Sequence, residues 1–218
     1  MEGRELEILR RSNVPAPLGA RGLQLPVAAI PLRDGTSALV LDSPAPGSFR
    51  LREVHLGTGK ELRSIATPFE GQPTAMALEP SGASALVAVD GGGFWRVARV
   101  DLREGTTLPV LSAGASLERG VARCIVSVGT GAALLTAGSS LVRLNLSDPA
   151  RAQAATVLSG LKTPWGIAVD PLRPNRVYLA ERDFVGPSGS GRVLAVDLDT
   201  LAKAPLATGA LNWHQDRN

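Results

Sequence analysis

The 218-residue sequence predicts an all-β fold made of four similar units. Two short motifs recur along the chain at intervals of about 46 residues. The apolar runs between them are short and bounded by turn residues, and none keeps a helical period over three turns. Each unit is therefore expected to consist of strands. The first motif begins at Ser37, Ser84, Ala132 and Arg176, and the second begins at Val54, Val100, Leu144 and Val196.

Each unit is expected to hold four strands, which is the content of one β-propeller blade. The turns after the innermost strands are 33–35, 79–82, 129–131 and 170–175, and the connections between the second and third strands are 43–48, 91–93, 137–140 and 182–191. The third strands end at the second motif, and the fourth strands are expected near 62–66, 108–112, 155–159 and 204–207. The predicted blades are 25–69, 70–116, 117–161 and 162–211, between a segment 1–24 and a tail 212–218.

The fourth unit contains the longest family-like pattern. It reads Leu161-Lys-Thr-Pro-Trp-Gly-Ile-Ala-Val-Asp-Pro, then Arg176-Val-Tyr-Leu-Ala-Glu, then Gly191-Arg-Val-Leu-Ala-Val-Asp-Leu. This pattern resembles one blade of the NHL-repeat and SMP-30/gluconolactonase-like six-bladed propellers, and the second unit carries a weaker copy that starts at Gln72. The resemblance is at the level of the blade, spans roughly residues 25–211, and is not tied to one subfamily.

The resemblance implies six blades, whereas the chain holds four. We therefore expect a partial propeller, and a complete four-bladed ring is the alternative. Residues 3–9 support the first interpretation, because Gly3-Arg-Glu-Leu is similar to Gly59-Lys-Glu-Leu, the approach to a fourth strand. They are expected to be the outer strand of a blade whose remainder is missing. The uncovered blade edges then favour self-association.

Composition excludes several classes of function. The net charge of +3 is spread along the chain, which argues against a nucleic-acid partner. The single cysteine, Cys124, cannot form an internal disulfide and is expected in a buried strand. The sequence shows no signal peptide and no apolar stretch long enough for a membrane span, and the compartment stays undetermined.

The site is expected at one rim of the propeller. In a four-stranded blade, the heads of the innermost strands lie at the same rim as the connections between the second and third strands. SMP-30-like lactonases hold a divalent metal there through acidic and amide side chains, so the resemblance implies such ligands only if this chain is a related enzyme. The four heads show no carboxylate, Asn or His, and no metal or other cofactor is predicted. The heads are Pro26-Val-Ala, Pro73-Thr-Ala, Val121-Ala-Arg and Pro164-Trp-Gly.

The residues that remain as candidates for binding are basic, aromatic or acidic. Arg123 and Trp165 suit an anionic or aromatic group, although packing between blades is the favoured role for Trp165 and for Trp95. Acidic residues recur at the upper ends of the second strands. As metal ligands they would have to converge across the channel, whereas as structural residues each accepts backbone N–H groups in its own connection, which is the favoured interpretation. The candidate binding residues are Asp42, Asp90, Arg123, Trp165, Glu181 and Asp183.

No catalytic residue is predicted. The chain has only two histidines, His55 and His214, which makes a histidine-based triad or a zinc site improbable. Two functions from different classes follow. The first is a non-catalytic, NHL-like binding module that presents its loop rim to a protein or small ligand. The alternative is a degenerate or truncated hydrolase similar to the SMP-30-like or strictosidine-synthase-like enzymes.

Overall fold

A computed structural model describes residues 23–45, 47–112, 120–148, 151–183 and 190–210. These residues form four antiparallel four-stranded sheets and no α-helix. The first two sheets consist of β1 (Pro26–Pro31), β2 (Ser37–Ala45), β3 (Ser48–His55) and β4 (Glu61–Ala66), and of β5 (Gln72–Leu78), β6 (Ser84–Asp90), β7 (Trp95–Asp101) and β8 (Thr107–Ser112). The other two consist of β9 (Ala122–Gly129), β10 (Ala132–Ala137), β11 (Ser140–Asn145) and β12 (Gln153–Leu158), and of β13 (Pro164–Asp170), β14 (Arg173–Asp183), β15 (Ser190–Asp197) and β16 (Lys203–Ala210).

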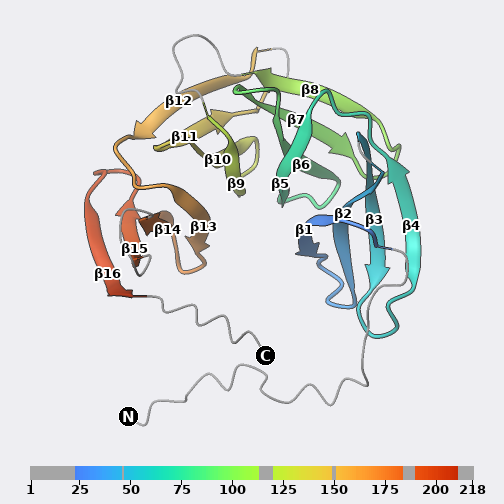
Figure 1. The fold of residues 1–218 in the computed structure, drawn as a ribbon, viewed down its shortest axis with the longest axis horizontal. Coiled ribbons are helices and arrows are strands. Elements are labelled where there is room, and N and C mark those ends of the chain that lie inside the picture. Colours follow the sequence, from blue (N-terminus) through green and yellow to red (C-terminus); the bar gives the residue numbers. More distant parts are fainter. Residues whose placement is uncertain (1–22, 46, 113–119, 149–150, 184–189, 211–218) are drawn as a thin grey trace.

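The four sheets are the blades of a β-propeller, and they follow one another around an arc (Figure 1). Within each blade the strands are paired in the order of the sequence. The innermost strands of successive blades pack together, β1 with β5, β5 with β9, and β9 with β13. The arc is open between the fourth blade and the first (Figure 1). The predicted all-β propeller with four blades is confirmed, and its open arc is consistent with a partial propeller.

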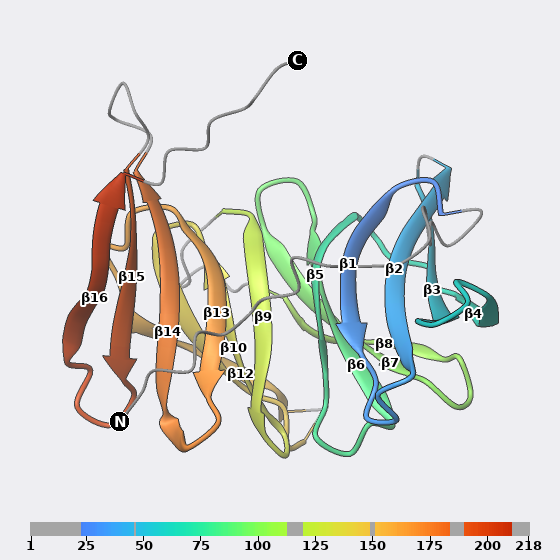
Figure 2. The same ribbon diagram turned by 90° about the horizontal axis from the view of Figure 1, so that it is seen from below.

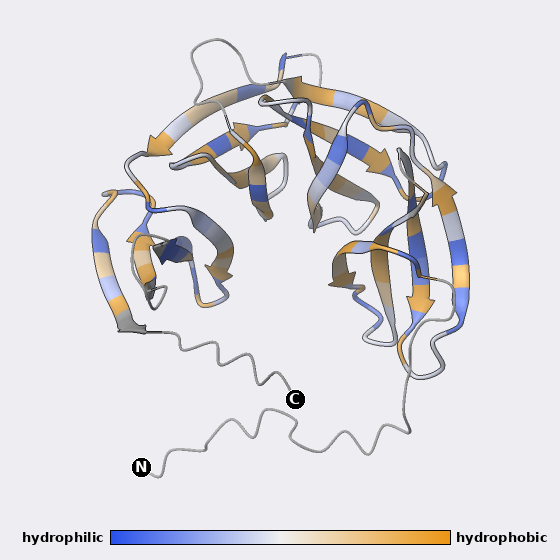
Figure 3. Cartoon of the chain, in the orientation of Figure 1, coloured by the Kyte–Doolittle hydropathy of each residue, from blue (hydrophilic) through white to orange (hydrophobic). Residues whose placement is uncertain are grey.

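Three apolar clusters hold the blades together, one at each interface between neighbours. Leu41 and Leu51 of the first blade pack with Val87 of the second. The second cluster joins Trp95 to the third blade, and the third cluster joins Leu134 to the fourth. The second strands of the middle blades are continuous apolar runs, such as residues 85–89, and because successive side chains point to opposite faces, both faces of a middle blade are buried (Figure 3). Burial of these faces against neighbouring blades is the main source of stability in a repeat fold.

The second repeated motif marks the turn between the third and fourth strands. Its leucine donates its backbone N–H to a carbonyl in or just after the turn between the first two strands in every blade: Leu56 to Thr36, Leu102 to Ala83, Leu146 to Gly131 and Leu198 to Asn175. The preceding residue accepts backbone N–H groups of its own turn. Asp101, Asn145 and Asp197 do so through side-chain oxygens, and His55 does so through Nδ1. His55 therefore has a structural role.

The two blades at the ends of the arc each have one face with no neighbouring sheet among the described residues. Leu39 and Leu41 pack against the second blade, so Asp42, which alternates with them, faces the open side. Leu56 is 48% exposed, whereas the equivalent Leu102 and Leu146 are at most 5% exposed because a preceding blade covers them. The expected outer strand at 3–9 and the tail 212–218 lie outside the described residues.

Candidate functional site

A β-bulge interrupts the head of each innermost strand. Pairing with the second strand skips one residue between Pro26 and Ala28, between Pro73 and Ala75, between Ala122 and Cys124, and between Pro164 and Gly166. A bulge leaves its extra residue unpaired and redirects the side chain. The four heads lie at one end of the molecule (Figure 2), which we call the loop rim. The extra residues are Val27, Thr74, Arg123 and Trp165.

The pairing register of β9 with β10 corrects the position that the sequence predicted for the head of the third blade. The third head was aligned as Val121-Ala-Arg, but the bulge makes Ala122-Arg-Cys the equivalent of Pro164-Trp-Gly. The third head has no proline to mark its start, so its position is one residue later than the motif spacing suggested. With this correction, Arg123 and Trp165 hold the same position in neighbouring blades.

Arg123 and Trp165 are in contact. The guanidinium carbon of Arg123 lies 4.6 Å from the centroid of the Trp165 indole ring, which is a cation–π geometry. Trp165 is 44% exposed, so the expected packing between blades is wrong for this residue. Trp95, in contrast, is fully buried between the second and third blades, as predicted. The pair thus presents a positive charge and an aromatic face at the loop rim.

Asp42 and Glu181 bind the chain that leads into the first strand of their own blade. Oδ1 of Asp42 accepts the N–H groups of Gln24 and Leu25 at 3.1 and 3.0 Å. Oε1 of Glu181 accepts the N–H of Lys162 at 2.7 Å. The sequence predicted bonds within the connection after the second strand, so this expectation is wrong for both residues. Each carboxylate instead ties the entrance of the innermost strand to the blade.

Arginines of the third strand complete both carboxylate sites. Arg52 donates to Asp42 at 3.0 Å and to Glu61, and Arg192 donates to Glu181. The Asp42 and Glu181 side chains are almost completely buried. Each oxygen of the two buried carboxylates therefore accepts at least one hydrogen bond from the chain. These bonds hold both side chains in the fold.

Asp90 and Asp183 differ from these two residues. Oδ1 of Asp90 accepts the N–H groups of Gly92 and Gly93 at 3.0 and 3.1 Å, so it caps its own connection as expected. Asp183 is the last residue of β14, and its side chain lies outside the described part. The acidic residues do not converge: in the described part of the chain, no three His, Cys, Asp or Glu side chains lie close enough to hold a metal ion.

Cys124 is half-buried in β9, next to the bulge. Burial raises the pKa of the Cys124 thiol, and backbone hydrogen bonds only partly oppose this. A raised pKa keeps the sulfur as a thiol, which is a poor nucleophile.

The described residues also contain no helix that could cross a membrane.

Comparisons with known proteins identify the fold of this chain but assign it to no family. No protein-family model matches the chain, and no curated protein matches it. Three solved structures resemble it. TolB from Acinetobacter baumannii has 14% identity and a TM-score of 0.63, over 86% of this chain and 44% of that one. Hydrazine synthase from Kuenenia stuttgartiensis has 14% identity and a TM-score of 0.63, over 84% of this chain and 50% of that one. The β-propeller domain of Cps50 (Swd1) from Myceliophteria thermophila has 12% identity and a TM-score of 0.56, over 85% of this chain and 57% of that one.

These likenesses show the β-propeller fold alone, because every identity is below 25%. The chain spans about half the length of the structures that it matches. One of the three is an enzyme by its name, so the fold does not decide between catalysis and binding. A functional conclusion has to come from the residues at the loop rim.

Proposed function

We propose that this chain is a non-catalytic binding module that presents its loop rim to a partner carrying an anionic, aromatic group. The observation that carries the proposal is the Arg123–Trp165 pair. Both residues occupy the bulge of an innermost strand, and the indole is 44% exposed. A guanidinium binds carboxylates through two parallel hydrogen bonds, and an indole face stacks on aromatic rings. Together they suit a partner such as an aromatic carboxylate or an acidic peptide with an aromatic side chain.

The hydrolase alternative has less support. An SMP-30-like metal site would need acidic or amide ligands at the heads of the innermost strands. The four bulge positions instead carry Val27, Thr74, Arg123 and Trp165. The nearby carboxylates of Asp42 and Glu181 are bonded to arginines and to backbone N–H groups. The family assignment to NHL-repeat or SMP-30-like propellers stays a proposal that rests on the pattern of the fourth blade.

Titration with benzoate tests the proposal through tryptophan fluorescence. Benzoate carries one carboxylate and one ring, and benzyl alcohol is its neutral control. We expect benzoate to change the emission of Trp165 and benzyl alcohol to bind at least about tenfold more weakly, because a hydrogen bond to a charged group contributes about 1.5–3 kcal/mol. Arg123→Gln should remove the difference between the two probes. Arg103→Gln is the matched control, since Arg103 is a strongly exposed arginine on a distant turn. Equal binding of both probes by the unmodified chain would reject the proposal.

A further inference from the structure

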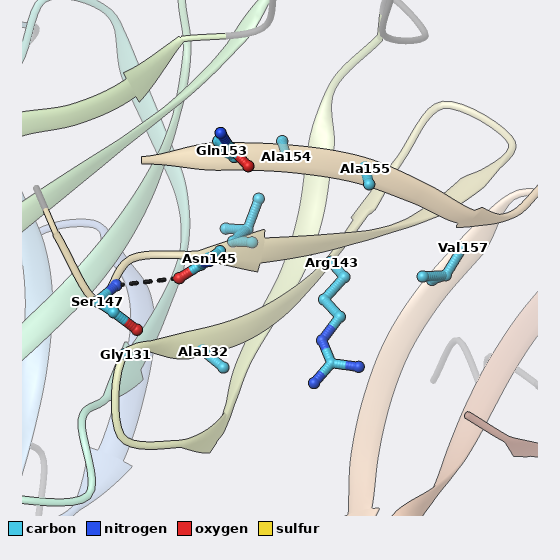
Figure 4. Close-up of a pocket in the computed structure, with 10 residues that line it drawn as sticks. Gly131, Ala132, Arg143, Asn145, Ser147, Gln153, Ala154, Ala155 and Val157 are labelled. Carbon is cyan, nitrogen blue, oxygen red and sulfur yellow. Dashed lines mark hydrogen bonds between the residues drawn. The ribbon is translucent and has the colours of Figure 1, made fainter. Parts of the chain in front are cut away.

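A cavity of about 480 Å³ opens on the third blade (Figure 4). It lies beside the turn after β9, at the end of the blade opposite the loop rim. This volume is within the range of small-molecule sites in proteins. The cavity lies on the face of the blade that is turned toward the fourth blade, because Arg143 is paired with Leu134, which packs there. Its lining comes from the turn after β9, from β10, β11 and β12, and from the turn after β11: Gly131, Ala132, Arg143, Leu144, Asn145, Ser147, Gln153, Ala154, Ala155 and Val157.

At the position of Arg143, the second blade has an arginine with hydrogen-bond partners that Arg143 lacks. In the second blade Arg99 occupies this position, since Arg99 is paired with Leu86 as Arg143 is with Leu134. Arg99 donates to the carbonyl of Leu146 in the third blade at 3.1 Å, and to Glu79 at 2.9 Å. An arginine thus bridges two blades and is neutralised by a carboxylate of its own blade.

The interface between the first and second blades contains a similar arginine bridge, which is made by different residues. Glu53 stands at the equivalent position and is paired across the strands with Arg63. Arg63 donates to Glu53 at 3.2 Å and to the carbonyl of Leu102 in the second blade. Two of the three interfaces therefore contain an arginine that reaches the second-motif leucine of the next blade.

Arg143 does not form this bridge. Within the described part of the chain, its guanidinium makes no hydrogen bond and no ion pair. The cavity lining contains no Asp or Glu that could play the part of Glu79. Figure 4 shows the Arg143 side chain extending into the space between its own blade and the next. Where the other two interfaces contain an arginine bridge, this one contains an open cavity and the unpaired guanidinium of Arg143.

The surroundings of Arg143 add polar and apolar contacts. Ser147 and Gln153 lie at one end of the cavity (Figure 4), and Ala155 and Val157 supply apolar surface. Gly131 is required where it stands, because a Cβ there would lie 2.6 Å from Oγ of Ser147, and because its φ of +67° favours glycine. Any larger residue would force Ser147 to move.

We propose that this cavity binds a small organic monocarboxylate through Arg143. One guanidinium neutralises one carboxylate in a two-bonded, planar geometry. The lining holds no second cation, which favours a single negative charge over a phosphate dianion. The short apolar wall of Ala155 and Val157 suits a compact, uncharged body. This inference does not depend on the loop rim, which lies at the other end of the blades.

Butyrate, butyramide and butyl phosphate are suitable probes for saturation-transfer NMR. We expect the unmodified chain to bind butyrate at least about tenfold more tightly than butyramide, and more tightly than butyl phosphate. Arg143→Gln should abolish the preference for butyrate, and Arg123→Gln should preserve it. Ala155→Glu should also abolish butyrate binding, because position 155 is directly opposite Arg143 across the strands and the new carboxylate would pair with the guanidinium.

Thermal unfolding provides a readout that does not involve a ligand. Arg99→Gln should lower the melting temperature by several degrees because it breaks a bridge, whereas Arg143→Gln should leave it unchanged. The proposal would be overturned if butyrate did not bind, if butyl phosphate bound more tightly, or if Arg143→Gln retained the preference for butyrate. Loss of butyrate binding in Arg123→Gln alone would assign it to the loop rim instead. A failure of benzoate at the loop rim would leave the Arg143 result unaffected.

Discussion

The guanidinium of Arg123 lies over the indole of Trp165, with 4.6 Å from its carbon to the ring centroid, and this contact links the third and fourth blades at the loop rim. The contact exists because both innermost strands carry a bulge at the same register position. Without the extra residue in each strand, these side chains would follow the regular alternation of the sheet. The bulges therefore create the part of the rim that the chain can offer to a partner.

A double-mutant cycle measures this contact. We expect Arg123→Ala, Trp165→Ala and the double variant to give a coupling free energy of about 0.5–1 kcal/mol, because the indole is partly exposed and the cation stays hydrated. Urea unfolding monitored by circular dichroism supplies the free energies of unfolding. Strict additivity of the two single changes would show that the two side chains do not interact in solution.

Asp42 in β2 and Asp90 at the end of β6 should differ in their contribution to stability, because Asp90 lies one residue beyond the position equivalent to Asp42. Asp42→Asn should lower the free energy of unfolding by about 2 kcal/mol, because it weakens a buried bond to Arg52 and two backbone bonds. Asp90→Asn should cost about 0.5 kcal/mol or less, because its partners are exposed glycine amides and an amide oxygen can also accept their hydrogen bonds. Chemical denaturation of both variants makes the comparison, and equal losses would contradict it.

Asp34 should titrate far below an ordinary aspartate. A hydrogen bond from the Ser37 hydroxyl, with backbone N–H bonds from Ser37 and Thr36, lowers the pKa of Asp34 to about 2. The unfolded chain has a value of about 3.9, so this carboxylate stabilises the fold above that pH and the contribution disappears as the pH falls from about 4 to 2. Carboxyl-carbon NMR should give a midpoint near 2, and Ser37→Ala should raise it. A midpoint near 4 in the unmodified chain would disprove these bonds.

The open faces of the first and fourth blades should promote self-association. Leu56 is 48% exposed on the first blade, and Ala168 and Ala180 are exposed on the fourth. We predict that light scattering after size exclusion gives a mass above 22.6 kDa that rises with concentration. Leu56→Lys should reduce the effect, while Leu108→Lys on the outer strand β8 should not. A stable monomer at every concentration would contradict this prediction.

The sequence predicted the architecture well because repeat spacing and turn residues are local signals. The second motif fixes a leucine amide and a capping side chain in each blade, so its four copies could be aligned by inspection. The third head was misplaced by one residue because a bulge changes the register without any mark in the sequence. The exposure of Trp165 was missed for the same reason.

The partners of charged residues could not be derived from the sequence. Asp42 and Glu181 lie opposite Pro26 and Pro164 of their first strands, whereas Asp90 lies one residue further along and opposite Gln72. This offset accompanies the difference in the N–H groups that they accept. Alignment of the second motif does place Arg143 in the column of Arg99. That Arg99 is bonded to the next blade and Arg143 is not became visible only from the contacts between blades.

The indole N–H signals of the three tryptophans test the proposed function most directly. A ¹H–¹⁵N spectrum separates them, and Trp165→Phe assigns the signal at the loop rim. Trp95 is fully buried and serves as the internal reference. We predict that benzoate shifts the Trp165 signal, leaves Trp95 unchanged, and loses its effect in Arg123→Gln. A Trp165 signal that does not respond to benzoate, or that responds equally with Arg123 replaced, would contradict binding at the loop rim.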